Sequence, residues 1–268
     1  MIRNDFTDKG VLITGGTRGI GLAIGLTFGR LGARVHLTHK WGSADEAVIR
    51  ETFAEAGAPE PRIYEADVSD KGDTKALFEA LRAEHERLEV FVSNVAFAQV
   101  TGALEEYKKR SLLTSLGYTA WPFVGYLQQI HKTFGLHPRY AVGLSSDGVE
   151  SYYPGYDFVA VSKKVMEVFC RYINEHLWDE DIRINVLRSR PVETASLDAT
   201  FGEDFAPFLR RYGGDHYLIQ TQEVADAVLA LCSGLMDGVS GQVLLLDRGV
   251  CFENNLMRLY EKREEFGL

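Results

Sequence analysis

Short apolar runs alternate with amphipathic stretches along the whole chain. The apolar runs have the length and β-rich composition of strands and lie at residues 10–14, 34–38, 88–94, 140–146, 182–187 and 241–247. The segments between them place apolar residues at helical spacing, as at 44–56 and 74–85. Because the runs are apolar on both faces, they are typical of parallel strands that helices cover on both sides. The pattern therefore predicts an α/β fold with a doubly wound parallel sheet.

Residues 194–220 interrupt this alternation. They contain many aromatic residues with little strand character, and they precede a helix that we expect to begin near Gln222. In doubly wound sheets the ligand crevice lies outside the carboxyl ends of the strands, so the segment is predicted to form a lid over that crevice. The sequence contains no repeat, low-complexity tract or Pro/Ser-rich linker. We therefore expect residues 1–268 to form a single domain.

Composition excludes several classes of function. With 46% hydrophobic and 25% charged residues, the chain has the proportions of a soluble globular protein. No apolar run reaches the length of a membrane span, and the first ten residues lack the apolar core of a signal peptide, so a cytoplasmic protein without membrane contact is predicted. The net charge of −9, from 29 basic and 38 acidic residues, argues against nucleic acid as a partner.

Neither the cysteines nor the histidines have the spacing of metal ligands. Cys170, Cys232 and Cys251 show no CxxC pattern and are predicted to be small buried residues without disulfides. His36 and His39 are three residues apart on a predicted strand, so they point to opposite faces of the sheet. We predict no metal site.

The first strand runs directly into a glycine-rich loop, which is followed by a helix expected from Leu22 to Arg30. Glycines at such a turn let the backbone approach a pyrophosphate, which then meets the positive end of the helix dipole. This context predicts a dinucleotide site. The loop residues expected to contact the cofactor are Gly15, Thr17, Arg18, Gly19, Ile20 and Gly21.

The end of the second strand indicates which dinucleotide is bound. A carboxylate there would accept a hydrogen bond from the 2′-hydroxyl of NADH, but the chain has Thr38, His39 and Lys40. Arg18 and Lys40 could instead neutralise the 2′-phosphate of NADPH. The sequence therefore favours NADPH, with two solvated surface cations as the alternative.

Motifs along nearly the whole chain resemble those of the short-chain dehydrogenase/reductase family. They are TGxxxGIG at residues 14–21, Asp67-Val68, the segment 93–96, a Ser-Tyr-Lys set and the segment 191–194. The resemblance implies a seven-stranded Rossmann-type sheet, usually in a homotetramer. It also implies that Asp67 and Val68 lie at the adenine, Asn94 beside the ribose, and Val192 and Thr194 at the carboxamide.

The catalytic helix departs from the usual Tyr-x3-Lys motif, because Val159 stands where that tyrosine belongs. Tyr156 lies seven residues before Lys163, and this Tyr-x6-Lys spacing resembles the enoyl-acyl carrier protein reductases of the family. Seven residues are nearly two helical turns, so both side chains share one face. Tyr152 and Tyr153 are alternative donors. The resemblance places the substrate-orienting serine at the end of the fifth strand, where Ser146 fits better than Ser145.

The shifted tyrosine suits an enoyl reduction. When hydride is added to C3 of an α,β-unsaturated thioester, negative charge develops on the thioester oxygen, two carbons away, so the acid must move accordingly. Lys163 would lower the pKa of the Tyr156 phenol and hold the ribose hydroxyls. We therefore predict an NADPH-dependent reductase of enoyl thioesters. A ketoreductase of a fatty-acid or natural-product pathway, and a catalytically silent NADP-binding protein, are the alternatives; Tyr156 would then only pack in a degenerate site.

Two further features concern the substrate. The usual proline-glycine before Pro191 is replaced by Ser189-Arg190, which puts a large cation near the expected nicotinamide, and the sequence does not fix where Arg190 points. In the lid, Arg210 and Arg211 lie beside aromatic residues and could receive a phosphopantetheine arm from an acidic acyl carrier protein. A solvated turn over the core is the alternative for the lid arginines.

Overall fold

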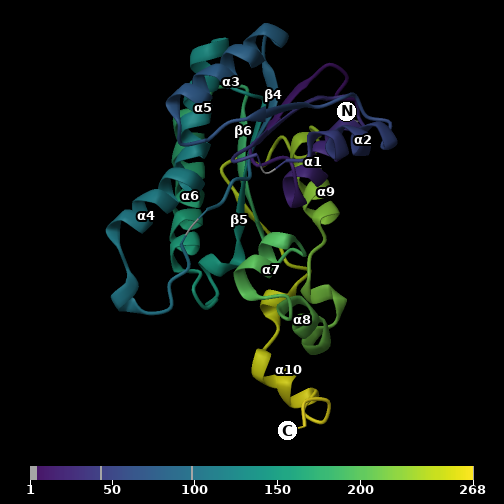
Figure 1. The fold of residues 1–268 in the computed structure, drawn as a ribbon, viewed down its shortest axis with the longest axis vertical. Coiled ribbons are helices and arrows are strands. Elements are labelled where there is room, and N and C mark those ends of the chain that lie inside the picture. Colours follow the sequence, from purple (N-terminus) through teal and green to yellow (C-terminus); the bar gives the residue numbers. More distant parts are fainter. Residues whose placement is uncertain (1–4, 43, 98, 268) are drawn as a thin grey trace.

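A computed structural model describes residues 5–42, 44–97 and 99–267. Seven parallel strands form one sheet in the order β3-β2-β1-β4-β5-β6-β7 (Figure 1). The strands are β1 (Gly10–Ile13), β2 (Arg34–His39), β3 (Arg62–Glu65), β4 (Leu88–Ser93), β5 (Tyr140–Ser146), β6 (Arg183–Ser189) and β7 (Val243–Leu246). The strand order reverses direction between β1 and β4, and the carboxyl ends of these strands border the crevice in which such folds bind ligands.

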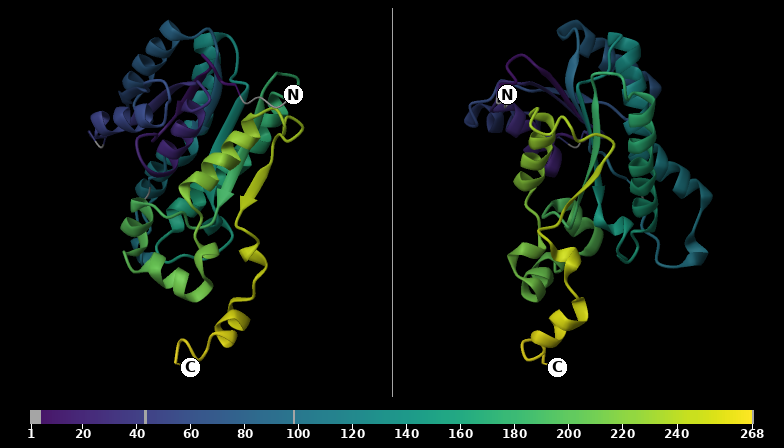
Figure 2. Two further views of the ribbon diagram at one scale, coloured as in Figure 1. Left: turned by 90° about the vertical axis from the view of Figure 1, so that its right-hand side faces the viewer. Right: turned by 180° about the vertical axis from the view of Figure 1, so that it is seen from behind.

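Helices cover both faces of this sheet (Figure 2). One face packs against α1 (Gly19–Gly29), α2 (Glu46–Glu55) and α9 (Thr221–Cys232). The other packs against α3 (Lys71–Glu84), α5 (Trp121–Phe134) and α6 (Asp157–His176). The alternation of strand side chains explains the two cores: on β1, Val11 and Ile13 join the first cluster, whereas Leu12 joins the second.

The predicted doubly wound sheet is confirmed, and the six apolar runs correspond to six of the seven strands. The pattern of hydrophobic positions did not reveal β3, which only the family resemblance implied. This strand lies at the edge of the sheet and begins and ends with the exposed residues Arg62 and Glu65. A half-covered edge strand lacks the continuous apolar run by which the central strands were recognised.

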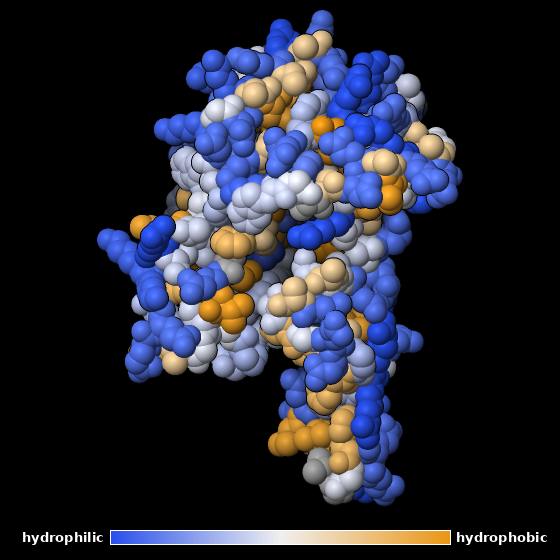
Figure 3. Space-filling model, in the orientation of Figure 1, coloured by the Kyte–Doolittle hydropathy of each residue, from blue (hydrophilic) through white to orange (hydrophobic). Residues whose placement is uncertain are grey.

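The predicted lid segment folds as two helices, α7 (Ala195–Phe201) and α8 (Phe205–Gly213). They share a small apolar cluster that includes Leu197, Leu209 and Tyr217. Beyond β7 the chain leaves the body and ends in α10 (Asn255–Glu261), which projects away from the sheet (Figures 1 and 2). Apolar residues gather on this projecting part (Figure 3).

Two of the three cysteines are buried as expected, whereas the expectation for Cys251 is wrong. Cys170 and Cys232 lie on helices that pack against the sheet, but Cys251 lies in a turn after β7, where the chain leaves the body. Within the described ranges, the chain has no helix both long and apolar enough to cross a bilayer.

Candidate active site

A cavity of about 540 Å³ lies at the carboxyl ends of the strands. The face drawn in Figure 3 is hollowed near its middle, between the body of the sheet and the lid helices. The predicted site residues that line this cavity are Gly15, Thr17, Arg18, Gly19, Ile20, Lys40, Asp67, Val68, Asn94, Ser146, Tyr156, Lys163, Val192 and Thr194. Gly21, in the first turn of α1, is not one of the residues that line it. The chain thus brings residues from six strand ends and from α6 to one place.

The glycine loop has the backbone that a close-lying ligand requires. Gly15 and Gly19 have φ values of +61° and +53°, which favour glycine. A Cβ atom on Gly21 would lie 2.3 Å from the carbonyl oxygen of Gly15, so a side chain cannot be accommodated there. Arg18 occupies the N-cap position of α1 without a side-chain hydrogen bond to the helix. The first N–H groups of α1 are therefore suited to bind an anion.

Lys40 lies beside Asp67 in the cavity. Its ammonium forms an ion pair with Asp67 and a hydrogen bond with the Tyr118 hydroxyl, and it lies 4.1 Å from the centre of the Trp41 ring. The Asp67 carboxylate and the Tyr118 hydroxyl raise the pKa of Lys40, although desolvation opposes them. Lys40 therefore already has an anionic partner in Asp67, the residue that the family resemblance placed at the adenine.

His39 is a polar residue of this cavity that the sequence analysis considered only as a metal ligand. Its side chain is buried, and neither ring nitrogen has a hydrogen-bond partner among the described residues. Arg18, by contrast, is exposed. Since buried polar atoms are nearly always hydrogen-bonded, the imidazole of His39 offers a free contact to a ligand.

Asn94 joins the end of β4 to the glycine loop. Its side-chain amide donates hydrogen bonds to the carbonyl oxygens of Thr14 and Gly15, at 3.1 and 2.8 Å. At the other end of the cavity, Val192 forms an isolated parallel bridge with Ile219, and Thr194 caps α7. These contacts fix the loop and the base of the lid to the sheet.

Tyr156 occupies the N-cap position of α6. It lines the cavity together with Val159 and Tyr153, whereas 84% of Tyr152 is exposed and it does not line the cavity. Tyr153 donates a hydrogen bond to Asp147, with the two oxygens 3.0 Å apart. Burial raises the pKa of Tyr156, and a hydrogen bond from Ser146 partly offsets this shift.

Lys163 is the buried cation of this site. Burial lowers its pKa to about 8, although the charge of Glu167 acts in the opposite direction. The two serines at the end of β5 face different surroundings. Ser145 donates a hydrogen bond to the buried Glu167 at 2.8 Å, whereas the Ser146 hydroxyl lies near Tyr156.

The helix before β5 contains a π-helical turn at Leu116–Ala120, between α4 (Lys109–Ser115) and α5. Pro122 follows this turn and has no N–H group to donate to the preceding turn, which accounts for the irregularity at this point of the helix. The turn places Tyr118 against Asp67, with a hydrogen bond of 3.1 Å. Through Tyr118 this segment lines the cavity beside Lys40.

The structure shows where Arg190 points. Its guanidinium lies 3.8 Å from the Asp147 carboxylate and 5.2 Å from the centre of the Tyr217 ring. Sequence reasoning missed Asp147, because the pair joins the ends of two neighbouring strands that are far apart in the chain.

The lid arginines already have partners within the chain. Arg210 pairs with Glu193 and Asp215, and Arg211 donates a hydrogen bond to the carbonyl of Glu265. Of the two, Arg211 is the one whose side chain forms no ion pair with a described residue.

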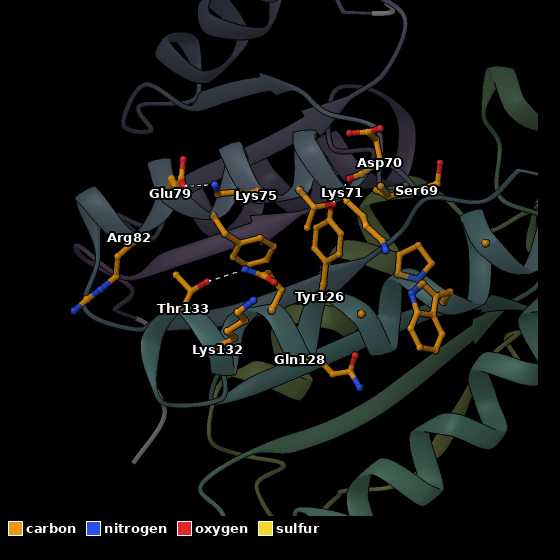
Figure 4. Close-up of a pocket in the computed structure, with 18 residues that line it drawn as sticks. Ser69, Asp70, Lys71, Lys75, Glu79, Arg82, Tyr126, Gln128, Lys132 and Thr133 are labelled. Atoms are coloured by element: carbon orange, nitrogen blue, oxygen red, sulfur yellow. Dashed lines mark hydrogen bonds and ion pairs between the residues drawn. The ribbon is translucent and has the colours of Figure 1, made fainter.

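Two other features lie away from this cavity. His36 contacts His85, with their Nε2 atoms 2.7 Å apart, and Glu84 lies within 4.8 Å of both rings. A larger cavity of about 830 Å³ lies between α3 and α5, where Lys71, Lys75 and Tyr126 face a groove (Figure 4). It is lined by none of Ser146, Tyr156 and Lys163, so we place the candidate active site in the smaller cavity.

Comparisons with known proteins identify the family of this chain. A family model described as "Enoyl-(Acyl carrier protein) reductase" matches residues 15–251. The 1-cyclohexenylcarbonyl-CoA reductase of Streptomyces collinus is 29% identical over 89% of this chain and 85% of its own length. The enoyl-[acyl-carrier-protein] reductase [NADH] FabI of Nostoc sp. is 24% identical over 91% of this chain and 97% of its own.

Among solved structures, a 7α-hydroxysteroid dehydrogenase complexed with NADH and 7-oxo glycochenodeoxycholic acid has the same fold. Its TM-score is 0.80 at 20% identity, covering 92% of this chain and 96% of that protein.

Proposed function

The chain belongs to the short-chain dehydrogenases/reductases described as enoyl-(acyl carrier protein) reductases, and from this premise we propose that it reduces α,β-unsaturated acyl thioesters with NADPH. It is an oxidoreductase of this family, and a nicotinamide dinucleotide is the cofactor that the fold implies. The identity of the dinucleotide, the roles of the site residues and the thioester substrate form our proposal.

The glycine loop fits the pyrophosphate, because a Cβ atom at Gly21 would collide with the loop and no side chain caps α1. Arg18, Lys40 and His39 would hold the 2′-phosphate. Asp67 competes for Lys40, so we expect a preference for NADPH of about tenfold rather than complete exclusion of NADH. When bound, the nicotinamide would supply the hydride that C3 of the substrate receives.

The observation that carries the proposal is the position of Tyr156. It lines the cavity at the N-terminus of α6, whereas the position of the family's usual tyrosine holds Val159, which has no proton to donate. In this place the Tyr156 hydroxyl can donate a hydrogen bond to the thioester oxygen, where charge develops during conjugate reduction. A preorganised donor of this kind stabilises the enolate before C2 takes up its proton.

Lys163 and Ser146 assist Tyr156 in this proposal. The Lys163 ammonium is buried beside the cavity, where it would hold the ribose hydroxyls and favour the phenolate form of the tyrosine. A hydrogen bond from Ser146 also favours the phenolate. The hydrogen bond from Ser146 opposes the burial that raises the pKa of Tyr156 and weakens it as an acid, and the Lys163 charge would act in the same direction.

The substrate is proposed to be an acyl thioester of coenzyme A or of an acyl carrier protein. Both classes occur in the names of the relatives. The cavity extends from the sheet to α7, whose residues Leu197 and Phe201 provide an apolar wall for an acyl group. Arg211 on α8 is exposed near the lid and would meet an acidic carrier.

NADPH oxidation with crotonyl-CoA, with acetoacetyl-CoA and without substrate tests the proposal. We expect rapid oxidation with crotonyl-CoA and little with the other two. Turnover of acetoacetyl-CoA alone would identify a ketoreductase. Tight NADPH binding without turnover of either thioester would indicate a silent binding protein.

A further inference from the structure

Two charged residues of the cavity have no role in the mechanism above. Asp147 follows β5 and Arg190 follows β6, and both line the cavity that contains Tyr156. Only 10% of the Asp147 side chain and 16% of the Arg190 side chain are exposed. Transferring two charges from water into such a place is costly, and their mutual attraction offsets this only when the hydrogen bonds between them are good.

The hydrogen bonds of this pair are incomplete. The distance between Arg190 Nη1 and Asp147 Oδ2 is 3.8 Å, too long for a hydrogen bond. The Oδ1 atom of Asp147 and the Nε atom of Arg190 are buried, and neither has a hydrogen-bond partner within the described ranges. Tyr153 donates to Oδ2 and fixes the carboxylate, while the Tyr217 ring covers one side of the guanidinium. One hydrogen-bond acceptor, Oδ1 of Asp147, and one donor, Nε of Arg190, therefore have no partner among the described residues.

A second carboxylate near Arg190, that of Asp247, does not supply the missing hydrogen bonds of the pair. Asp247 is buried, and its charge interacts with Arg190. However, its two oxygens already accept hydrogen bonds from the backbone N–H groups of Gly249 and Cys251, each at 2.9 Å. Both oxygens of Asp247 thus have partners, whereas Oδ1 of Asp147 and Nε of Arg190 have none among the described residues.

The chemistry of a group that would complete the pair is restricted. An alkyl chain would leave both polar atoms unpaired, and a carboxylate on the substrate would be repelled by Asp147. A carbonyl oxygen would satisfy Arg190 alone. A hydroxyl group satisfies both, because it donates one hydrogen bond and accepts another. A hydroxyl group would reach Oδ1 of Asp147 and Nε of Arg190 if the two side chains moved apart. No hydrogen bond between the two side chains opposes this movement.

We propose that Asp147 and Arg190 bind a hydroxyl group on the acyl part of the substrate, with Asp147 accepting its hydrogen and Arg190 donating to its oxygen. The inference rests on the proposed function and makes it more specific. The preferred substrates are enoyl thioesters that carry a hydroxyl substituent, rather than enoyl thioesters with plain alkyl chains. Asp147 and Arg190 then determine specificity, while Tyr156 and Lys163 serve the reaction.

The test compares substrates of equal chain length: pent-2-enoyl-CoA, 4-hydroxypent-2-enoyl-CoA and 5-hydroxypent-2-enoyl-CoA. We expect kcat/KM to be about tenfold or more higher for at least one hydroxylated substrate, because hydrogen bonds to charged groups are among the stronger ones. In the double variant Asp147→Leu/Arg190→Met, which leaves no lone buried charge, this ratio should fall towards one. Arg248→Met, an arginine outside the cavity that pairs with Glu223, is the matched control and should keep the ratio of the parent.

Three outcomes would overturn the inference. The parent enzyme could reduce all three substrates equally well, which needs no variant to establish. The preference could survive in the double variant. The double variant could instead lose NADPH affinity while keeping the preference, which would assign the pair to the cofactor. If the enzyme reduced no enoyl thioester at all, the proposed function itself would fail, so the two failures are distinguishable.

Discussion

The Lys163 ammonium donates a hydrogen bond to the backbone carbonyl of Leu144, with Nζ and O 2.9 Å apart. The carbonyl belongs to β5 and the lysine to α6, so this bond joins that helix to the sheet. A single neutral acceptor compensates little for the lost hydration of an ammonium group. Burial accordingly lowers the pKa of Lys163 to about 8.

This pKa predicts how the rate depends on pH. The ammonium form is nearly complete below about pH 7 and half lost at pH 8, so kcat/KM should be level below about pH 7 and fall as the pH rises through 8. A profile of enoyl-thioester reduction between pH 6 and 10 measures this. In Lys163→Met the residual rate should show no fall near pH 8. A parent profile that is level to pH 10 would contradict the role given to the ammonium.

The ion pair of Lys40 and Asp67 predicts the effect of a charge reversal on cofactor choice. Lys40→Asp removes a cation from the 2′-phosphate and places a second carboxylate beside Asp67. We expect the Kd of NADPH to rise by about 10- to 100-fold and that of NADH by much less. Fluorescence titration with both cofactors measures this, and Lys132→Asp, on α5 outside the cofactor cavity, is the control. Equally tight binding of NADH and NADPH by the parent protein would refute the assignment.

The lid predicts a difference between carrier-bound and free thioesters. Arg210 is held by Glu193 and Asp215, so reversing its charge would disturb the lid itself. Arg211→Glu is the cleaner change, because among the residues that the structure describes its guanidinium contacts only a carbonyl and the Phe266 ring. We expect KM to rise several-fold for an enoyl-acyl carrier protein and to stay unchanged for the coenzyme A thioester. An equal effect on both substrates would rule out carrier recognition at this arginine.

The contact between His36 and His85 predicts loss of stability in mild acid. Burial lowers the pKa of both imidazoles, that of His36 to about 3, and the charges of Arg62 and Arg34 add to the shift at His36. The unfolded chain binds protons below pH 6.5, whereas the folded chain does not. Stability is therefore lost as the pH falls below 6.5, by roughly 1 kcal/mol for His36 between pH 6.5 and 5.5.

Thermal melting at pH 7.5 and 5.5 measures this effect. His36→Gln cannot bind the proton, so its Tm should fall less between the two pH values than that of the parent protein. His176→Gln, on the exposed last turn of α6, is the control and should behave like the parent. An identical decrease in all three proteins would show that other groups cause the acid sensitivity.

The central strands could be predicted because each is buried on both faces and therefore appears in the sequence as an apolar run. The same signal was absent at β3, where Arg62 and Glu65 are exposed at the sheet edge. Helix boundaries were correct to within three residues, as for α3, expected at 74–85 and found at Lys71–Glu84. Its true beginning is set by Asp70, whose carboxylate caps the first N–H groups.

The parts of the candidate site that depend on residues close together in the sequence could be predicted. The contacts between residues far apart in the sequence could not. The glycine loop and the spacing of Tyr156 and Lys163 can be identified from consecutive residues. The pairing of Asp147 with Arg190 arises from the register of β5 and β6, which the sequence does not state. The same holds for the contact of His36 with His85, which joins a strand to the end of a helix 49 residues later.

The shifted tyrosine leads to the most specific prediction about the chemistry. Tyr156→Phe removes one preorganised hydrogen-bond donor from the developing enolate and should lower kcat on an enoyl thioester by about 10² to 10³. NADPH affinity should barely change, because the phenol hydroxyl is not among the groups proposed to hold the cofactor. Tyr152→Phe is a matched control, since this tyrosine lies four residues earlier and is 84% exposed. It should retain the rate of the parent.

Tyr153 and Val159 complete this test, because both line the same cavity. Tyr153 already donates a hydrogen bond to Asp147, and burial raises its pKa, so Tyr153→Phe should cost far less rate than Tyr156→Phe. Val159→Tyr restores the family's usual tyrosine but places it about 5 Å deeper, so enoyl reduction should not increase. Single-turnover NADPH oxidation with saturating enoyl substrate decides between the tyrosines. A Tyr156→Phe rate within about threefold of the parent, which corresponds to less than about 0.7 kcal/mol of barrier, would remove Tyr156 from the mechanism.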